Sequence, residues 1–125
     1  MTSEVKVRVP ASGEFLQVLR NVVAALAARA GCSVDVLADL RLAVDEAALR
    51  LLHDVPGADG VVVEAERRDG ALALSVAVDA DADGWPRPDL TTSMGWHIIS
   101  SLVEDAEPTT TDDGPAIAFR VSTGG

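Results

Sequence analysis

The chain has 125 residues, 48% of them hydrophobic, which predicts one domain, residues 1–125, built around a single core. Twenty acidic and ten basic residues give a net charge of -10, which argues against nucleic acid as the direct partner and favours a basic protein partner. The charged N-terminal segment, the lack of a membrane-spanning stretch and a single cysteine predict a cytoplasmic protein without membrane contact.

The first half of the chain predicts one strand followed by two helices. Alternating valines and cations indicate a half-buried strand over residues 5–10. Ser12 then has the chemistry of an N-cap for an amphipathic helix, whose apolar residues recur with a period of 3.6 until Gly31. Ser33 is a second candidate N-cap, and the helical pattern that follows it covers residues 34–54. We therefore expect two successive helices with one buried face each.

The second half of the chain predicts two hairpins separated by a loop and a third helix. Residues 80–93, "ADADGWPRPDLTTS", have loop composition, and residues 94–105, "MGWHIISSLVED", return to helical spacing. The paired strands of the two hairpins are predicted at residues 60–68 with 71–78, and at residues 106–111 with 116–122.

This order of elements predicts the α+β class. Hairpin strands need no crossover connection, so a mostly antiparallel sheet of four or five strands is expected, with about three helices on one of its faces. Val44 and Leu51 of the second helix should lie buried against that sheet.

Glu46 lies within an otherwise apolar helix, and a buried carboxylate is costly unless it has a partner or a task. One stripe of the helix holds Asp39, Leu42, Glu46, Arg50 and His53. In one interpretation, Glu46 and Arg50 form a surface ion pair worth about 0.3 to 0.5 kcal/mol. In the other, the stripe forms the floor of a pocket beneath residues 80–93, with Glu46 as a general base. Spacing alone leaves both open.

The segment "LRLAVDEAALRLLHD" resembles the N-box helix of the bacterial anti-sigma factor serine kinases, the RsbW and SpoIIAB type of the histidine-kinase-like (GHKL) ATPase superfamily. The pattern of that helix is roughly "LAVSEAxTNxxxHA". The resemblance extends to the first strand, the "FLQVLRNVV" helix, a strand ending in aspartate, and "MGWHIISSLVEDAE", and it is greatest for a divergent actinobacterial branch. It implies a single-domain Bergerat-type sandwich.

The resemblance assigns roles to the N-box residues. Glu46 matches the glutamate that takes the proton from the hydroxyl or water attacking the γ-phosphate. Arg50 stands where the family has an asparagine that holds Mg²⁺, and a guanidinium carries no acceptor for a cation. His53 falls one residue short of the family's histidine, so its role is not carried over. The resemblance thus implies weak binding of ATP or ADP and poor retention of Mg²⁺, with no other metal site.

Two further segments match the family's nucleotide-binding motifs in part. Asp79 is the best match to the adenine-recognising aspartate, with Asp81 next to it, although both also suit a turn that leaves a strand. Ser93 and Gly95 match a phosphate-binding loop that opens a helix, where free amides favour anions. Trp96, on the helical stripe that follows, is more typical of a core residue.

These observations support three classes of function. The first is an anti-sigma factor that sequesters a sigma factor and is released by an anti-anti-sigma partner of the STAS type, with a degenerate nucleotide site. The second is an active ATP-dependent serine/threonine kinase that phosphorylates that antagonist. The third is an unrelated α+β scaffold with a structural ion pair. The family usually dimerises, which leaves a homodimer open.

Overall fold

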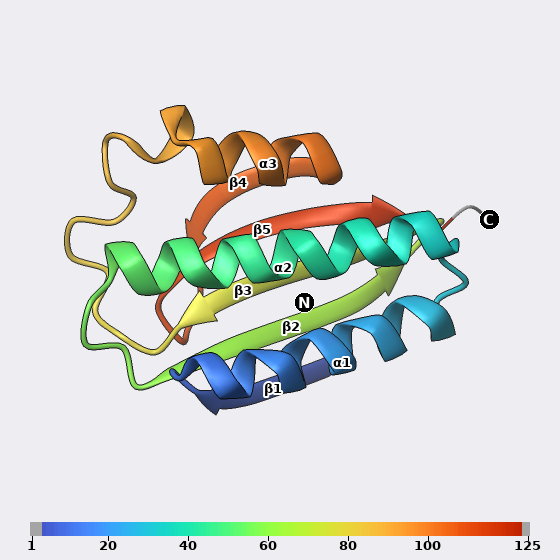
Figure 1. The fold of residues 1–125 in the computed structure, drawn as a ribbon, viewed down its shortest axis with the longest axis horizontal. Coiled ribbons are helices and arrows are strands. Elements are labelled where there is room, and N and C mark those ends of the chain that lie inside the picture. Colours follow the sequence, from blue (N-terminus) through green and yellow to red (C-terminus); the bar gives the residue numbers. More distant parts are fainter. Residues whose placement is uncertain (1–3, 124–125) are drawn as a thin grey trace.

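The computed structural model describes residues 4–123 as three helices packed on one face of a five-stranded sheet (Figure 1). In chain order the elements are β1 (Val5–Pro10), α1 (Gly13–Arg29), α2 (Val34–Asp54), β2 (Gly60–Arg68), β3 (Ala71–Val78), the 3₁₀-helix η1 (Leu90–Thr92), α3 (Met94–Leu102), β4 (Glu104–Thr110) and β5 (Pro115–Ser122). The strand order is β1-β2-β3-β5-β4 with antiparallel neighbours. The predicted α+β class is confirmed.

The central strand β3 shows how the sequence divides between the two faces of the sheet. Leu72, Leu74 and Val76 belong to the main core beneath the helices. The residues between them are small, and Ala77 is buried in a separate small cluster. Because side chains alternate along a strand, these small residues face away from the helices. The sheet therefore has one large apolar face, which the helices cover.

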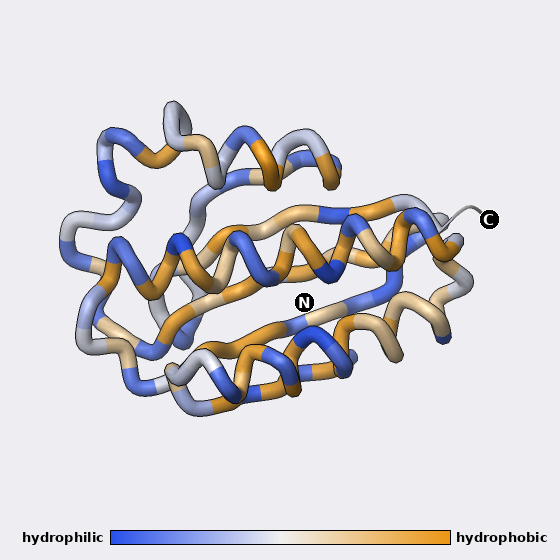
Figure 2. Tube along the Cα trace, viewed as in Figure 1, coloured by the Kyte–Doolittle hydropathy of each residue, from blue (hydrophilic) through white to orange (hydrophobic). Residues whose placement is uncertain are grey.

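Helix α2 lies in the centre of the helical layer, with α1 on one side and α3 on the other (Figure 1). Its N-cap is Ser33, whose hydroxyl accepts a hydrogen bond from the amide of Val36, as predicted. Val44 and Leu51 are buried, also as predicted, and apolar and polar residues alternate along the helix (Figure 2). Within residues 4–123 neither α2 nor any other helix is long and apolar enough to cross a membrane.

The boundary between α3 and β4 differs from the prediction. The helix ends at Leu102 instead of continuing to residue 105, and β4 begins at Glu104, two residues early. Val103 is already extended, and Asp105 has a φ of 55°, which places an irregularity in the β4–β5 ladder. The ion pair of Asp105 with Arg120 of β5, at 2.7 Å, shows that this segment is committed to the sheet.

Ser12 and residues 80–93 also differ in detail from the sequence interpretation. Ser12 occupies the N-cap position of α1, but its side chain forms no capping hydrogen bond. Residues 80–93 are mainly loop, as expected, yet they contain the 3₁₀-helix η1 with Leu90 buried in the core. One apolar anchor thus holds the end of this loop against the molecule.

Candidate functional site

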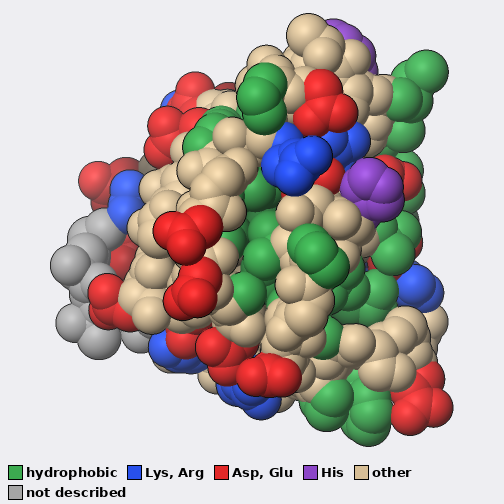
Figure 3. Space-filling view, turned by 90° about the vertical axis from the view of Figure 1, so that its left-hand side faces the viewer, with side chains coloured by type: hydrophobic (Ala, Val, Ile, Leu, Met, Phe, Trp, Pro, Cys, Tyr) green, Lys and Arg blue, Asp and Glu red, His purple; other side chains and the backbone are tan. Residues whose placement is uncertain are grey.

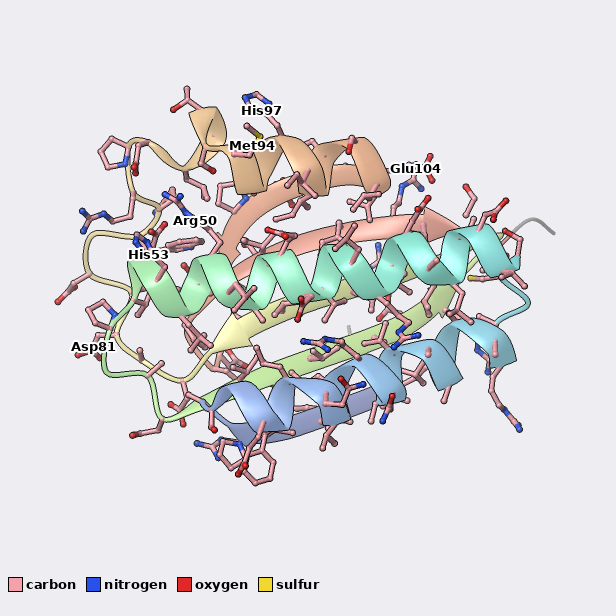
Figure 4. All side chains as sticks on the ribbon, viewed as in Figure 1. Arg50, His53, Asp81, Met94, His97 and Glu104 are labelled. Carbon is pink, nitrogen blue, oxygen red and sulfur yellow. The ribbon has the colours of Figure 1, made fainter. Side chains whose placement is uncertain are left out.

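Arg50 links α2 to the loop of residues 80–93, which we call the lid loop. Its Nε donates a hydrogen bond of 2.9 Å to Oδ2 of Asp54, one turn further along α2. Its Nη2 lies 3.3 Å from Oδ1 of Asp89, in the lid loop. The side chains of Arg50 and Asp54 are 16% and 3% exposed, whereas that of Asp89 is 73% exposed. Figure 4 shows Arg50 at the C-terminal half of α2, on the side of the lid loop.

The ion pair between Glu46 and Arg50, one of the two sequence-based interpretations, is absent. Arg50 is engaged by Asp54 and Asp89, and the Glu46 carboxylate forms no hydrogen bond or ion pair with another residue in the range 4–123. Asp54 is the more deeply buried carboxylate and therefore has the greater need of a cation. The ion-pair interpretation was wrong for Glu46.

Glu46 instead faces the beginning of α3. It is half-buried, and its Oε2 lies 3.6 Å from the position that a Cβ would take on Gly95. A carboxylate beside a helix N-terminus is favoured by the partial positive charge of the first turn. The structure thus brings Glu46 and Gly95 together, whereas the acidic side chains beneath residues 80–93 line a hollow that does not include Glu46.

Ser93 serves as the N-cap of α3. Its hydroxyl accepts a hydrogen bond from the amide of Trp96 and donates one to the carbonyl oxygen of Leu90. Trp96 is buried, as its helical spacing predicts, while His97 is exposed and points away from α2 (Figure 4). Ser93 therefore lies near Gly95, but its hydroxyl is committed to the protein's own backbone.

Asp79 and Asp81 lie in a different place, at the end of β3. Asp79 follows the strand directly, and its Oδ2 accepts a hydrogen bond of 2.9 Å from Nη2 of Arg8. Asp81 is exposed at the edge of the molecule (Figure 4). Both line a hollow of about 820 Å³, which we call the acidic hollow. Its charged lining consists of seven aspartates and one arginine: Asp54, Asp59, Asp79, Asp81, Asp83, Asp112, Asp113 and Arg87.

Strand β1 supplies two cations to the aspartates of the acidic hollow. Arg8 binds Asp79, and Nζ of Lys6 lies 3.0 Å from Oδ2 of Asp113. The hydrogen bond with Asp113 raises the pKa of Lys6, which keeps that ammonium charged. Acidic side chains nevertheless predominate at this end of the molecule (Figure 3).

Five of the six sequence-predicted site residues therefore fall into two groups. Glu46, Ser93 and Gly95 meet at the start of α3, and none of them lines the acidic hollow that holds Asp79 and Asp81. Arg50 lies between the two groups, because its partner Asp54 also lines the hollow.

The charges and lone pairs of these residues bear on whether a magnesium-bound triphosphate could be held here. The carboxylates of the acidic hollow repel phosphate oxygens, and Oδ2 of Asp79 is occupied by Arg8. Arg50 has no lone pair to give a metal. In the described part of the chain, no group of three or more His, Cys, Asp or Glu residues could hold a metal ion.

Sequence reasoning missed three residues that determine this arrangement. Asp54 could have been found, because it stands four residues after Arg50 on the same helix. Asp89 and Arg8 carry no such signal. Their ion pairs with Arg50 and Asp79 join residues 39 and 71 positions apart, and only the fold brings them together.

Comparison with known proteins shows the family of this chain. A model of the histidine kinase-like ATPase domain matches residues 9–121. The chain belongs to this family. It is also 32% identical over 104 residues to the proteins named Anti-sigma-F factor RsbW from Mycobacterium tuberculosis strains CDC 1551 / Oshkosh and ATCC 25618 / H37Rv. The match covers 82% of this chain and 60% of each relative, so the chain spans about three-fifths of their length.

The family assignment confirms the resemblance that the N-box helix indicated, and it agrees with the two-layer fold. Membership of an ATPase-domain family makes a nucleotide the natural candidate ligand. Family members share an architecture, whereas function depends on the residues at the site. The residues at the candidate site therefore carry more weight for function than the shared fold does.

Proposed function

We propose that this chain is an anti-sigma regulatory domain that sequesters a sigma factor and is released by an anti-anti-sigma protein of the STAS type. The observation that carries the proposal is the 32% identity to two proteins named anti-sigma-F factor, over 82% of this chain. The net charge of -10 supports it, because sigma factors present basic surfaces for nucleic acid.

We further propose that the nucleotide site is degenerate, so that ATP or ADP binds weakly and with little dependence on Mg²⁺. By the resemblance, Arg50 stands where a metal ligand is expected, and its guanidinium is held by Asp54 and Asp89. A guanidinium can contact phosphate oxygens directly, but it cannot coordinate Mg²⁺. A nucleotide bound without a metal to align its phosphates for in-line attack should undergo little phosphoryl transfer.

An active serine/threonine kinase is the second candidate, because one observation favours it. The Glu46 carboxylate is free of hydrogen bonds to residues 4–123 and faces the start of α3 at Gly95. A free carboxylate beside a phosphate-binding loop is what a general base for phosphoryl transfer requires.

The sigma-factor proposal is tested by direct binding between purified proteins. The sigma factors of the source organism are immobilised one at a time, and association with this chain is measured at about 0.05 and 0.3 M salt. We expect one of them to bind, with faster association at low salt, and a STAS protein to displace it. A basic protein unrelated to sigma factors is the control. Equal binding to that control, or no binding to any sigma factor, would contradict the proposal.

The nucleotide proposal is tested by titrating labelled ATP with and without Mg²⁺, in the unmodified chain and in Arg50→Asn. We expect weak binding that ignores Mg²⁺ in the unmodified chain and a gain in Mg²⁺ dependence in the variant. Transfer of phosphate to a serine of the antagonist is measured in parallel, with Glu46→Gln as control. Tight Mg²⁺-dependent binding, or rapid transfer that Glu46→Gln abolishes, would establish the kinase instead.

A further inference from the structure

We propose that Arg50 is a positioning residue that fastens the lid loop to α2, so that the loop is held closed by the chain's own charges. The proposal concerns how the loop is held, which is a separate matter from partner binding. Only its consequence for nucleotide rests on the proposed function.

We call the bridge Asp54–Arg50–Asp89 the strap. Its fixed end is the pair of Arg50 and Asp54 on α2. Arg50 and Asp54 are one helical turn apart, their side chains are largely buried, and their hydrogen bond is 2.9 Å long. The helix beneath them is anchored by Leu51, which is fully buried. The guanidinium therefore stands in one orientation with a second N–H edge available, which is the geometry in which arginine bridges two carboxylates.

The movable end of the strap is Asp89. This residue occupies the N-cap position of η1, but its side chain forms no capping hydrogen bond and is turned to Nη2 of Arg50. Its backbone carbonyl oxygen accepts a hydrogen bond from the Thr92 hydroxyl, so the carboxylate and the 3₁₀ turn are one unit. Holding Asp89 therefore holds η1 and the segment that leads into α3.

Two uncharged anchors hold the rest of the loop. The indole N–H of Trp85 donates a hydrogen bond of 2.9 Å to the carbonyl oxygen of Thr109 in β4. Leu90 is buried in the core. These anchors fix the loop at two points, while the ion pair at Asp89 ties it sideways to α2.

The positive charge of Arg50 reduces the repulsion between aspartates of the lid loop and aspartates of the rest of the chain. Asp81 and Asp83 of the loop line the acidic hollow together with Asp54 and Asp79, and Asp89 of the loop lies on the other side of Arg50 from Asp54. Like charges in such proximity repel, and a closed loop needs a positive group between the two sets. Arg50 is that group for Asp54 and Asp89. The loop is consequently closed before any nucleotide arrives, and a phosphate that binds Arg50 has to displace Asp89.

Hydrogen exchange of the lid-loop amides measures whether the strap holds. The useful reporters are the amides of Trp85, Leu90 and Ser93, which donate hydrogen bonds to carbonyl oxygens within the loop. Exchange is followed by mass spectrometry in the unmodified chain, in Asp89→Asn and in Asp83→Asn. Asp83 is the matched control, because it is an exposed aspartate of the same loop without an ion pair to residues 4–123.

We expect Asp89→Asn to accelerate exchange of these amides about two- to fivefold, the range for losing an exposed ion pair. Asp83→Asn removes a repelling charge of the acidic hollow and no ion pair, so it should not accelerate exchange. Adding Arg50→Met to Asp89→Asn should accelerate exchange no further than Arg50→Met alone. Mg²⁺ with ATP should not slow exchange in the unmodified chain. Asp89 is on the surface, so its replacement does not endanger folding.

Two outcomes would overturn the strap. In the first, Asp89→Asn exchanges no faster than Asp83→Asn, which would mean that the ion pair holds nothing. In the second, the unmodified loop exchanges rapidly until ATP and Mg²⁺ are added, which would mean that the nucleotide closes it. Neither outcome touches sigma-factor binding, which the immobilised-protein assay measures separately.

Discussion

Replacing Arg50 by methionine should destabilise the fold, mainly because it leaves Asp54 without its principal cation. Methionine keeps much of the apolar stem but removes the N–H groups that bind Asp54 and Asp89. Breaking a buried ion pair by removing one partner costs about 3 to 5 kcal/mol. Here His53 still lies 3.0 Å from Asp54, at the exposed end of the helix, which reduces the cost. The exposed pair with Asp89 adds about 0.5 kcal/mol.

The lower end of the buried-pair range, about 3 kcal/mol, plus about 0.5 kcal/mol for Asp89, less about 1.5 kcal/mol for the hydrogen bond that His53 retains with Asp54, leaves about 2 kcal/mol. We therefore expect Arg50→Met to lower the free energy of unfolding by about 2 kcal/mol. An unfolding entropy of about 2.1 cal/mol/K per residue gives about 0.26 kcal/mol/K for a chain of this length, so Tm should fall by about 8 °C. Urea unfolding and calorimetry both measure this change.

The matched control is the double variant Arg50→Met with Asp54→Asn. Asparagine carries no charge at this buried position, so the double variant should recover more than half of the loss if the stranded carboxylate is its cause. The reasoning is refuted if Arg50→Met stays within about 0.5 kcal/mol of the unmodified chain, the range of ordinary surface substitutions. It is equally refuted if Asp54→Asn worsens the single variant.

Two further predictions concern places outside the site. Gly114→Ala should lower stability by more than about 2 kcal/mol, because φ is +145° and a Cβ would lie 2.3 Å from the carbonyl oxygen of Val78. Gly13→Ala, where a Cβ meets nothing within 4 Å, is the control, and equal urea midpoints for the two would show the argument to be wrong. Burial raises the pKa of the Cys32 thiol, so less thiolate is present near pH 8, and iodoacetamide should alkylate the folded chain more slowly than the urea-unfolded chain. Equal rates would contradict this.

Much of the fold follows from local signals in the sequence. Ser33 supplies a capping hydroxyl where the apolar repeat of α2 begins, and the turn between β2 and β3 has hairpin chemistry, so both elements were predicted with their observed bounds. The boundary after α3 was missed. Val103 continues the apolar spacing of the helix, and only pairing of the following segment with β5 makes that residue extended.

The sequence named candidate site residues, but it did not show which of them would lie together in the fold. The proximity of Glu46 and Gly95 follows from the order of the elements. The helix after the lid loop packs beside α2, so its first residues lie next to Glu46. The separation of Asp79 and Asp81 from that point was not predictable, because it depends on the path of residues 80–93. Ion pairs between distant segments, such as Arg50 with Asp89, depend on the same path.

Arg50 itself shows why a local rule can choose the wrong partner. It stands four residues after Glu46 and four before Asp54, so spacing offers two carboxylates. In isolated helices the pair with the acid on the N-terminal side is the better one, which favours Glu46. In the folded chain Asp54 is 3% exposed, and a carboxylate so far removed from water costs several kcal/mol if unpaired. Glu46 is only half-buried and faces a helix N-terminus, which already favours its charge. The cost of desolvating Asp54 is therefore larger than the preference of a few tenths of a kcal/mol between helical pairs, and Glu46 has no ion pair among residues 4–123.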